Sequence, residues 1–297
     1  MNSIVQDVRD KGILLSDGGW GSELIAQGLA VGECPESWNL DHREAVLAVA
    51  RSYADAGPDL ITTNTFGGSR IQLDKHGLGG QAAAINREGA AISREAMGPG
   101  RHVNASIGPS GEILMMGAVT GDDLYAAFKE QAVAFEEGGA DACLVETMMD
   151  LEEATTAIRA VKENTNLEVV CTMTFQRAEG DVYNTMMGIT PQAFVEGALD
   201  AGASVIGANC TLGPAELTAL VKQLREAAPE DVPVMVQPNA GQPVNEGGGL
   251  HYPETPESFA AYVPRFIDAG ARILGGCCGT GPAHIAAMRD AIDKAKG

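Results

Sequence analysis

The chain has 297 residues, of which 45% are hydrophobic and 20% charged, and its formal net charge is −20. This acidity disfavours nucleic acid and anionic membrane surfaces as partners, because both attract basic proteins. No apolar run approaches the roughly 20 residues that a membrane-spanning helix needs, and residues 1–11 are too polar for a signal peptide. With six cysteines and no such leader, we expect a cytoplasmic protein whose thiols stay reduced.

Short apolar runs alternate with helical patterns along the whole chain. Strands are predicted at 13–17, 59–63, 102–107, 142–147, 168–174, 204–210, 233–238 and 272–276, and helices at 41–56, 81–97, 122–137, 151–164, 191–201, 215–227, 256–269 and 282–296. The strands are continuous apolar runs, which indicates parallel strands covered on both faces. The pattern predicts an α/β fold, a single (β/α)8 TIM-type barrel in which residues 1–297 form one domain. A doubly wound open sheet is the alternative.

Polar residues stand at the predicted C-terminal ends of the strands, where barrels of this class gather their chemistry. Two of them, Asp17 and Glu146, are carboxylates, and a buried carboxylate needs a compensating partner. A substrate ammonium group would serve, and the backbone N–H groups of Gly18 and Gly19 are suited to a substrate carboxylate. We therefore expect a small amino acid here, with Thr63 and Ser106 also in contact. For Asp17 alone, a turn or helix cap explains the residue equally well.

The segment 275–280 places Cys277 and Cys278 side by side between glycines. Adjacent cysteines seldom pair with each other, because the ring is strained, and the glycines leave the backbone free to turn both sulfurs to one side. Cys210 ends another apolar run. Three thiolates at strand ends with one open position would hold a catalytic zinc ion. Buried cysteines acting as small hydrophobes are the alternative, which we favour for Cys210 taken alone but not for the glycine-flanked pair.

The remaining candidate residues have simpler interpretations. The five histidines are scattered without metal-ligand spacing, and we interpret them as surface or loop residues, at positions 42, 76, 102, 251 and 284. None ends a predicted strand, which argues against a zinc hydrolase, since such an enzyme needs a base beside its metal. Methionines between 148 and 187 are interpreted as core and loop filler. Trp20 either walls the pocket or packs under a loop.

Six segments together resemble the homocysteine S-methyltransferase family, most of all the homocysteine-binding barrel of cobalamin-dependent methionine synthases: Asp17–Leu24, Gly32–Glu36, Thr63–Gly67, Gly207–Cys210, Gln237–Gly241 and Gly275–Thr280. The resemblance runs from about residue 12 to residue 292. It implies a (β/α)8 barrel that methylates homocysteine to methionine at a Zn²⁺ ion held by Cys210, Cys277 and Cys278. It also implies a homocysteine head group held by Asp17, Gly18, Gly19 and Glu146.

Some features leave the methyl donor open. The family's first motif usually reads Asp-Gly-Ala-Met-Gly-Thr, where this chain has Gly19, Trp20 and Ser22. The motif sequences are most similar to those of the cobalamin-dependent branch of the family, which favours methylcobalamin on a separate corrinoid protein as the donor. That protein would meet a rim formed by Trp20, Gly67–Gly68 and a loop at 237–256. The alternatives are betaine or S-methylmethionine as the donor, or a non-catalytic module that binds homocysteine and zinc. Oligomeric state is not given by the sequence.

Overall fold

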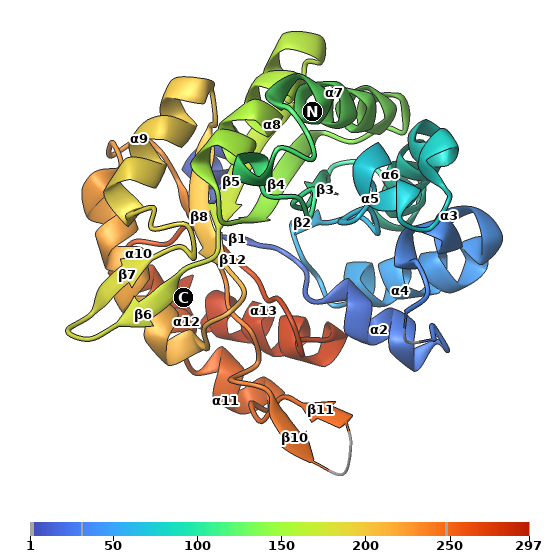
Figure 1. The fold of residues 1–297 in the computed structure, drawn as a ribbon. Helices are drawn as coiled ribbons and strands as arrows, with labels where there is room; N and C mark the ends of the chain where they lie inside the picture. The colour runs from blue at the N-terminus through green and yellow to red at the C-terminus, as the bar shows by residue number, and fades with distance from the viewer. Residues whose placement is uncertain (1–2, 31, 247–248, 297) are drawn as a thin grey trace.

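A computed structural model describes residues 3–30, 32–246 and 249–296, and its centre is an eight-stranded parallel sheet rolled into a nearly closed barrel (Figure 1). The strands follow the order β1-β12-β9-β8-β5-β4-β3-β2. Their bounds are Leu14–Leu15 (β1), Leu60–Ile61 (β2), His102–Ile107 (β3), Ala142–Met148 (β4), Glu168–Met173 (β5), Val205–Asn209 (β8), Val234–Gln237 (β9) and Ile273–Leu274 (β12). The predicted TIM-type barrel is confirmed, and the open doubly wound sheet is excluded.

Helices surround the barrel because each strand is apolar on both faces and must be covered on its outer one. The helices are α2 (Trp20–Ala26), α3 (Trp38–Asp41), α4 (Arg43–Asp55), α5 (Arg70–Asp74), α6 (Ala82–Met97), α7 (Gly121–Glu137), α8 (Leu151–Asn164), α9 (Pro191–Ala201), α10 (Pro214–Ala227), α11 (Pro256–Ala260), α12 (Val263–Ala269) and α13 (Pro282–Lys296). Short 3-10 turns occur at Pro35–Ser37, Gly79–Gln81 and Leu114–Met116 (η3). No helix in the described ranges is long and apolar enough to cross a membrane.

The seam between β1 and β2 is closed by hydrogen bonds of two aspartates, Asp59 and Asp17. Asp59 donates its backbone N–H to the carbonyl of Leu15 (2.7 Å), and its carboxylate accepts the N–H of Leu15 (2.9 Å). Directly after β2, the backbone N–H of Thr62 donates to the carboxylate of Asp17 (2.8 Å). The barrel thus closes through side chains where the two short strands leave backbone groups without a ladder partner.

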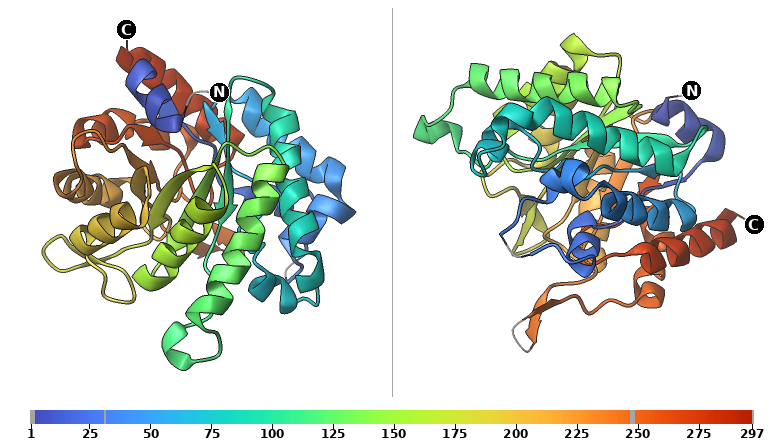
Figure 2. Two further views of the ribbon diagram at one scale, coloured as in Figure 1. Left: turned by 90° about the horizontal axis from the view of Figure 1, so that it is seen from above. Right: turned by 90° about the vertical axis from the view of Figure 1, so that its right-hand side faces the viewer.

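Helix α1 (Ile4–Lys11) closes the end of the barrel opposite the loop that carries η3 (Figure 2, left). Its Ile4 and Val8 pack into a cluster with inward-facing side chains of the strands, such as Leu144 and Met235. The interpretation of His102 as a surface or loop residue is wrong. Its side chain is buried in β3, and its Nε2 atom lies 3.1 Å from the Asp7 carboxylate of α1.

Three predicted segments differ from the structure. The expected helix 256–269 is split into α11 and α12, because Pro264 has no N–H and its ring would collide with the carbonyl of residue 260. The expected loop at 237–256 contains a hairpin, β10 (Val244–Glu246) with β11 (Gly249–His251), although residues 247–248 lie outside the described part. A second hairpin, β6 (Gln176–Ala178) with β7 (Val182–Asn184), follows β5.

Candidate metal and substrate site

The three thiols singled out in the sequence meet at the C-terminal ends of β8 and β12, the two strands on either side of β9. Their sulfur atoms all lie within 4.8 Å of one another, and the sulfurs of Cys210 and Cys278 are 3.8 Å apart. The C-terminal end of β9 aligns both segments, since the backbone N–H of Cys210 donates to the carbonyl of Gln237 (3.0 Å) and that of Cys277 donates to the carbonyl of Pro238 (2.8 Å). In the chain, Cys210 is 67 positions from Cys277 and 68 positions from Cys278, and the fold brings the three residues together.

The proton affinities of the thiols differ because the sulfurs contact one another. Hydrogen bonds from Cys210 and Cys277 lower the pKa of Cys278. Hydrogen bonding with the other two thiols, together with burial, raises the pKa of Cys277. A single thiolate is thus favoured in the cluster, and a second or third thiolate needs a cation beside it.

This donor set fits a zinc ion. Thiolates are soft ligands that zinc accepts in tetrahedral sites with Zn–S bonds of about 2.3 Å, which places neighbouring sulfurs ~3.8 Å apart. The separation of Cys210 and Cys278 is 3.8 Å. Three protein ligands leave one position of a tetrahedron for a substrate, which is the arrangement of catalytic zinc sites.

A short segment that follows β11, Tyr252–Glu254, lies against the cysteine loop; we name it the 252–254 strap. A Cβ atom on Gly279 would lie only 2.2 Å from Cγ of Tyr252, so the tyrosine ring rests directly on that glycine. Burial, followed by the charge and hydrogen bonding of Cys278, raises the pKa of Tyr252 to about 12. The backbone N–H of Glu254 donates to the carbonyl of Ala240 (3.0 Å), which fixes the strap to the loop after β9.

Asp17 follows β1 and is fully buried, with hydrogen-bond donors around its carboxylate. One oxygen accepts from the backbone N–H of Thr62 (2.8 Å), from the Thr62 hydroxyl (2.9 Å) and from the Trp20 indole (2.9 Å), and the other accepts from Ser16 (3.2 Å). Burial nevertheless raises the pKa of Asp17 to about 6. The protein itself thus compensates much of this charge, and Trp20 acts as one of its donors.

Glu146 lies near the end of β4 and keeps partial contact with solvent. Its carboxylate accepts from the hydroxyl of Ser106 at the end of β3 (2.5 Å) and from the amide of Asn209 at the end of β8 (3.3 Å). Burial raises the pKa of Glu146 to about 7. With only neutral donors against it, this carboxylate is suited to a cationic ligand group.

Some of the other predicted substrate contacts face the site, and others lie behind it and hold its residues in place. Ser106 faces the site, because its hydroxyl binds Glu146. Thr63 supports it from behind, since its hydroxyl lies 2.5 Å from that of Thr65 and accepts the N–H of Ser106 (3.0 Å). Gly18 and Gly19 pass so close to the cysteine loop that a Cβ on either would lie 2.7 Å from a carbonyl oxygen there, and the N–H of Gly19 donates to Thr280 (2.9 Å).

Sequence reasoning missed three residues that shape the site: Asn209, Tyr53 and Tyr252. Asn209 directly precedes Cys210 in the segment Gly207–Cys210, and this position is the one feature of the sequence that indicates a role for it. Tyr53 appears in the sequence as an ordinary core position of α4, yet its hydroxyl reaches the carbonyls of Gly19 (2.9 Å) and Thr280 (3.1 Å). The strap could not be recognised because its contacts to Gly279 and Ala240 depend on how the chain folds.

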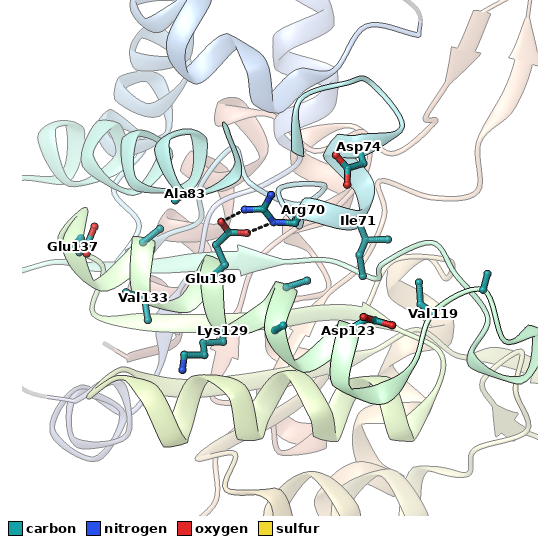
Figure 3. A pocket seen from close by; sticks show the side chains of 14 residues that line it. Arg70, Ile71, Asp74, Ala83, Val119, Asp123, Lys129, Glu130, Val133 and Glu137 are labelled. Atoms are coloured by element: carbon teal, nitrogen blue, oxygen red, sulfur yellow. Dashed lines mark hydrogen bonds and ion pairs between the residues drawn. The ribbon is translucent and has the colours of Figure 1, made fainter. Parts of the chain in front are cut away.

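A groove of about 780 Å³ lies elsewhere on the molecule, along helices α5, α6 and α7 (Figure 3). Its floor is mostly small and apolar, and Arg70 forms two hydrogen bonds to Glu130 across it (3.0 and 2.5 Å). None of the predicted site residues lines this groove. This groove is thus separate from the thiols and carboxylates at the strand ends.

Comparison with known proteins identifies a family that matches most of the chain. Residues 14–292 match the family model described as Homocysteine S-methyltransferase. The methionine synthase of Mycobacterium tuberculosis (strain ATCC 25618 / H37Rv) is 31% identical over 98% of this chain and 25% of its own length, and that of Mycobacterium leprae (strain TN) is 30% identical over 94% and 24%. The chain thus spans about a quarter of the length of these curated relatives.

Among solved structures, the metallated form of the homocysteine methyltransferase MmuM from Escherichia coli superposes with a TM-score of 0.80. The two proteins are 23% identical, and the match covers 96% of this chain and 99% of that one. The apo form of the same protein gives a TM-score of 0.75 over 97% of this chain. At this level of identity the likeness shows a shared barrel fold.

Proposed function

Because the chain belongs to the homocysteine S-methyltransferase family, we propose that it transfers a methyl group to the sulfur of homocysteine and so forms methionine. The observation that carries this proposal is the set of three thiols within 4.8 Å of one another at the C-terminal mouth of the barrel. Cys210, Cys277 and Cys278 would hold one Zn²⁺ ion. Bound there, zinc lowers the pKa of a coordinated thiol, so that the sulfur of homocysteine is a thiolate at neutral pH.

The protein's own residues orient the amino acid beside the thiols. Glu146 receives the ammonium group, and its carboxylate is held in place by Ser106 and Asn209. Asp17, which follows β1, adds negative charge at the same end of the barrel. Gly18 and Gly19 keep the first turn within reach of the cysteine loop, and of their two N–H groups that of Gly19 is engaged by Thr280. Alignment of a thiolate with an electrophilic methyl group is the main catalytic contribution such a site can make.

The metal-holding role has a direct test in metal content. Purified protein should contain about one zinc per chain, since one tetrahedral site accepts three cysteine ligands. The variant with Cys277→Ala and Cys278→Ala should lose it, while Cys171→Ala, which changes a buried thiol of β5, should keep it. A full zinc complement in the double variant would place the metal elsewhere.

For the methyl donor we favour methylcobalamin carried by a separate corrinoid protein. Three loops at the C-terminal face, which follow β2, β3 and β5, expose apolar side chains. These are Phe66, Ile113, Met115, Met116, Met186 and Met187. The side chains of Met115 and Met116 are 85% and 78% exposed. Exposed apolar groups around a reaction site are typical of a surface that meets another protein. The curated relatives are methionine synthases about four times longer than this chain, as the covered shares of 25% and 24% show.

A small onium compound, such as the zwitterion betaine or the net cation S-methylmethionine, is the second candidate for the donor. The net charge of −20 favours the approach of a cation over that of an anion. A homocysteine-dependent assay with methylcobalamin on a carrier protein, betaine and S-methylmethionine in parallel separates the two candidates. Methylation of homocysteine by none of the three would support a non-catalytic module that binds homocysteine and zinc.

A further inference from the structure

Asn209, the last residue of β8, lies between the carboxylate and the thiols and is only 1% exposed. Its amide oxygen accepts the backbone N–H of Thr147 (3.0 Å) and the hydroxyl of Thr172 (2.9 Å). Its amide nitrogen lies 2.7 Å from the hydroxyl of Thr147, 3.3 Å from the carboxylate of Glu146 and 3.9 Å from the sulfur of Cys277. One side chain thus contacts both the proposed substrate pocket and the proposed metal site.

The orientation of this amide is determined by its partners. A backbone N–H can only donate, so the Asn209 atom that faces Thr147 N must be the oxygen. The NH₂ group consequently points at the Thr147 hydroxyl and at Glu146 and Cys277, the two neighbours that carry negative charge when ionised. Hydrogen bonds to ionised acceptors are the strong ones, and they hold both acceptors in position.

The backbone around Asn209 adds a second observation. Thr147, Cys210 and Thr211 have φ angles of 60°, 61° and 58°, in the left-handed region that side-chain-bearing residues seldom adopt. The Asn209 side chain accepts the N–H of Thr147. The hydroxyl of Thr174 donates to the backbone carbonyl of Asn209 (2.7 Å) and lies 2.9 Å from the hydroxyl of Thr211. Such conformations persist where the surrounding contacts impose them, and they concentrate at functional sites.

We propose that Asn209 is a positioning residue that couples the two halves of the site, through an NH₂ group shared between Glu146 and Cys277. The inference rests on the proposed function for the identity of the substrate. The hydrogen bond reduces the electron donation of the Cys277 sulfur and fixes the carboxylate that receives the substrate ammonium group. A change at Asn209 therefore alters metal and homocysteine binding together.

The decisive variant is Asn209→Asp, which keeps the oxygen that accepts from Thr147 and Thr172 but replaces the donating NH₂ by a second oxygen. The backbone of Thr147 and the hydroxyl of Thr172 are both held by the oxygen that Asp retains, so their positions should be preserved. Protein loaded with Co²⁺ reports on the sulfurs through its thiolate-to-cobalt absorption band. In Asn209→Asp the band should move to longer wavelength, and homocysteine should bind at least roughly tenfold more weakly, in the range usual for residues that support metal ligands.

The matched control is Thr172→Val, which removes a partner of the amide oxygen without touching the NH₂ group, and its band should stay in place. Should Asn209→Asp fail to fold, Glu146→Gln provides a second test. Removal of the competing carboxylate lets the NH₂ group donate more fully to Cys277, so the cobalt band should move to shorter wavelength.

An unchanged band and unchanged homocysteine affinity in Asn209→Asp, or an unmoved band in Glu146→Gln, would overturn the proposal. The cobalt band needs no methyl transfer and no homocysteine. A protein that binds Co²⁺ through the cysteines and shows the band shift, but methylates no homocysteine, would contradict the proposed function and leave the role of Asn209 intact.

Discussion

At the scale of single residues, the two carboxylates of the site differ in what compensates their charge. Asp17 is met by the protein's own donors, including a backbone N–H and an indole N–H. Glu146 is met by one hydroxyl and by an amide that it shares with other groups. Of the two, Glu146 therefore has more to gain from a ligand ammonium group.

Replacement of Glu146 by Gln should weaken homocysteine binding by about 1.5–3 kcal/mol, because it removes one charge-assisted hydrogen bond. Zinc content should stay near that of the wild type, since Glu146 is not among the clustered thiols. Calorimetric titration with homocysteine and metal analysis of the same sample measure both quantities. Equal homocysteine affinity in the two proteins would remove Glu146 from the substrate pocket.

The pH dependence of product binding follows from the same carboxyl group. Burial raises the pKa of Glu146 to about 7, so the group is neutral below this pH and negatively charged above it. Methionine has no thiol that titrates, and its ammonium group should bind roughly tenfold more tightly at about pH 8 than at about pH 6. The Glu146→Gln protein should lack this dependence, and a dependence of equal size in both proteins would assign it to another group.

Trp20 has a defined role that the sequence left open. Its indole donates to the buried Asp17, and its ring lies 6.2 Å from that of Tyr53. Trp20→Phe keeps an aromatic ring but removes a hydrogen bond to a charged acceptor, which should lower the free energy of unfolding by about 1.5–3 kcal/mol when Asp17 is ionised.

The sign of the pH effect at Asp17 distinguishes this mechanism from a loss of packing. The pKa of Asp17 is about 6, above its ordinary 3.8, so ionisation of this group costs stability as the pH rises through this window. The indole lowers that cost. The difference between the Trp20→Phe and wild-type proteins in denaturant unfolding should therefore be largest above about pH 7 and shrink towards about pH 5. A difference that is constant with pH would indicate lost packing alone.

Some site residues can be recognised from the local sequence around them, and others cannot. Cys277, Cys278 and Glu146 stand out because packing and turn formation do not explain these residue types at a strand end. Asn209, Tyr53 and Tyr252 were missed because each has a plausible local role, and its actual contacts come from segments that are distant in the chain. Residue type thus predicts the groups that carry charge or bind metal better than it predicts those that support them.

At the scale of elements, the prediction succeeded where a segment has a single strong period. Helix α8 and strand β3 begin and end where the sequence placed them, at Leu151–Asn164 and His102–Ile107. The hairpins β6–β7 and β10–β11 were missed because their strands have three residues each, too few for a periodic pattern. Helix α2 was missed because its glycine-rich start indicates a turn.

The 252–254 strap depends on glycine at position 279, which has a φ of 79° and the Tyr252 ring against it. Gly279→Ala adds the cost of left-handed backbone, about 1–2 kcal/mol, and in addition forces the strap away from the cysteine loop. Zinc should therefore be released to a chelator faster than from the wild type.

Gly77→Ala is the matched control for this prediction. Gly77 has a φ of 71°, and a Cβ there would meet no atom within 4 Å. The control should lose a similar amount of stability in denaturant unfolding, while its zinc release stays at the wild-type rate. If both variants released zinc equally fast, the strap would have no part in retaining the metal.

At the scale of the whole molecule, the barrel separates stability from chemistry. Helix α1 covers one end of the barrel, and the loop that carries η3 lies at the opposite end (Figure 2). The end covered by α1 contains the packed cluster with Ile4 and Val8, whereas the opposite end carries the thiols, both carboxylates and the loops that expose apolar side chains. The rim predicted around Gly67 and Gly68 needs revision. A Cβ on Gly67 would lie 2.9 Å from the carboxylate of Glu36, and one on Gly68 would lie 2.3 Å from the amide of Asn86. These glycines are required by close packing inside the protein, so a bulky residue there would be a poor probe of a partner.

The β3–α7 loop provides a better probe of the donor. Met115 and Met116 are almost fully exposed, so Met115→Ser with Met116→Ser should leave the free energy of unfolding within about 0.5 kcal/mol of the wild type. If a carrier protein docks on this face, loss of two apolar contacts, each worth about 1 kcal/mol or more, should lower transfer from carrier-bound methylcobalamin by roughly tenfold or more. Transfer from betaine or S-methylmethionine should be unchanged, because a small molecule needs no docking surface.

Leu40→Ser, on α3 at the outer side of the helix layer (Figure 1), is the control. Leu40 is 40% exposed but belongs to a helix that packs against α4 and α6 rather than to a loop at the mouth. Its variant should transfer methyl groups from every donor at the wild-type rate. Equal loss with all donors in the methionine variant, or full activity with an onium donor and none with carrier-bound methylcobalamin in the wild type, would contradict a protein-borne donor. The second outcome would instead assign the site to a small onium methyl donor.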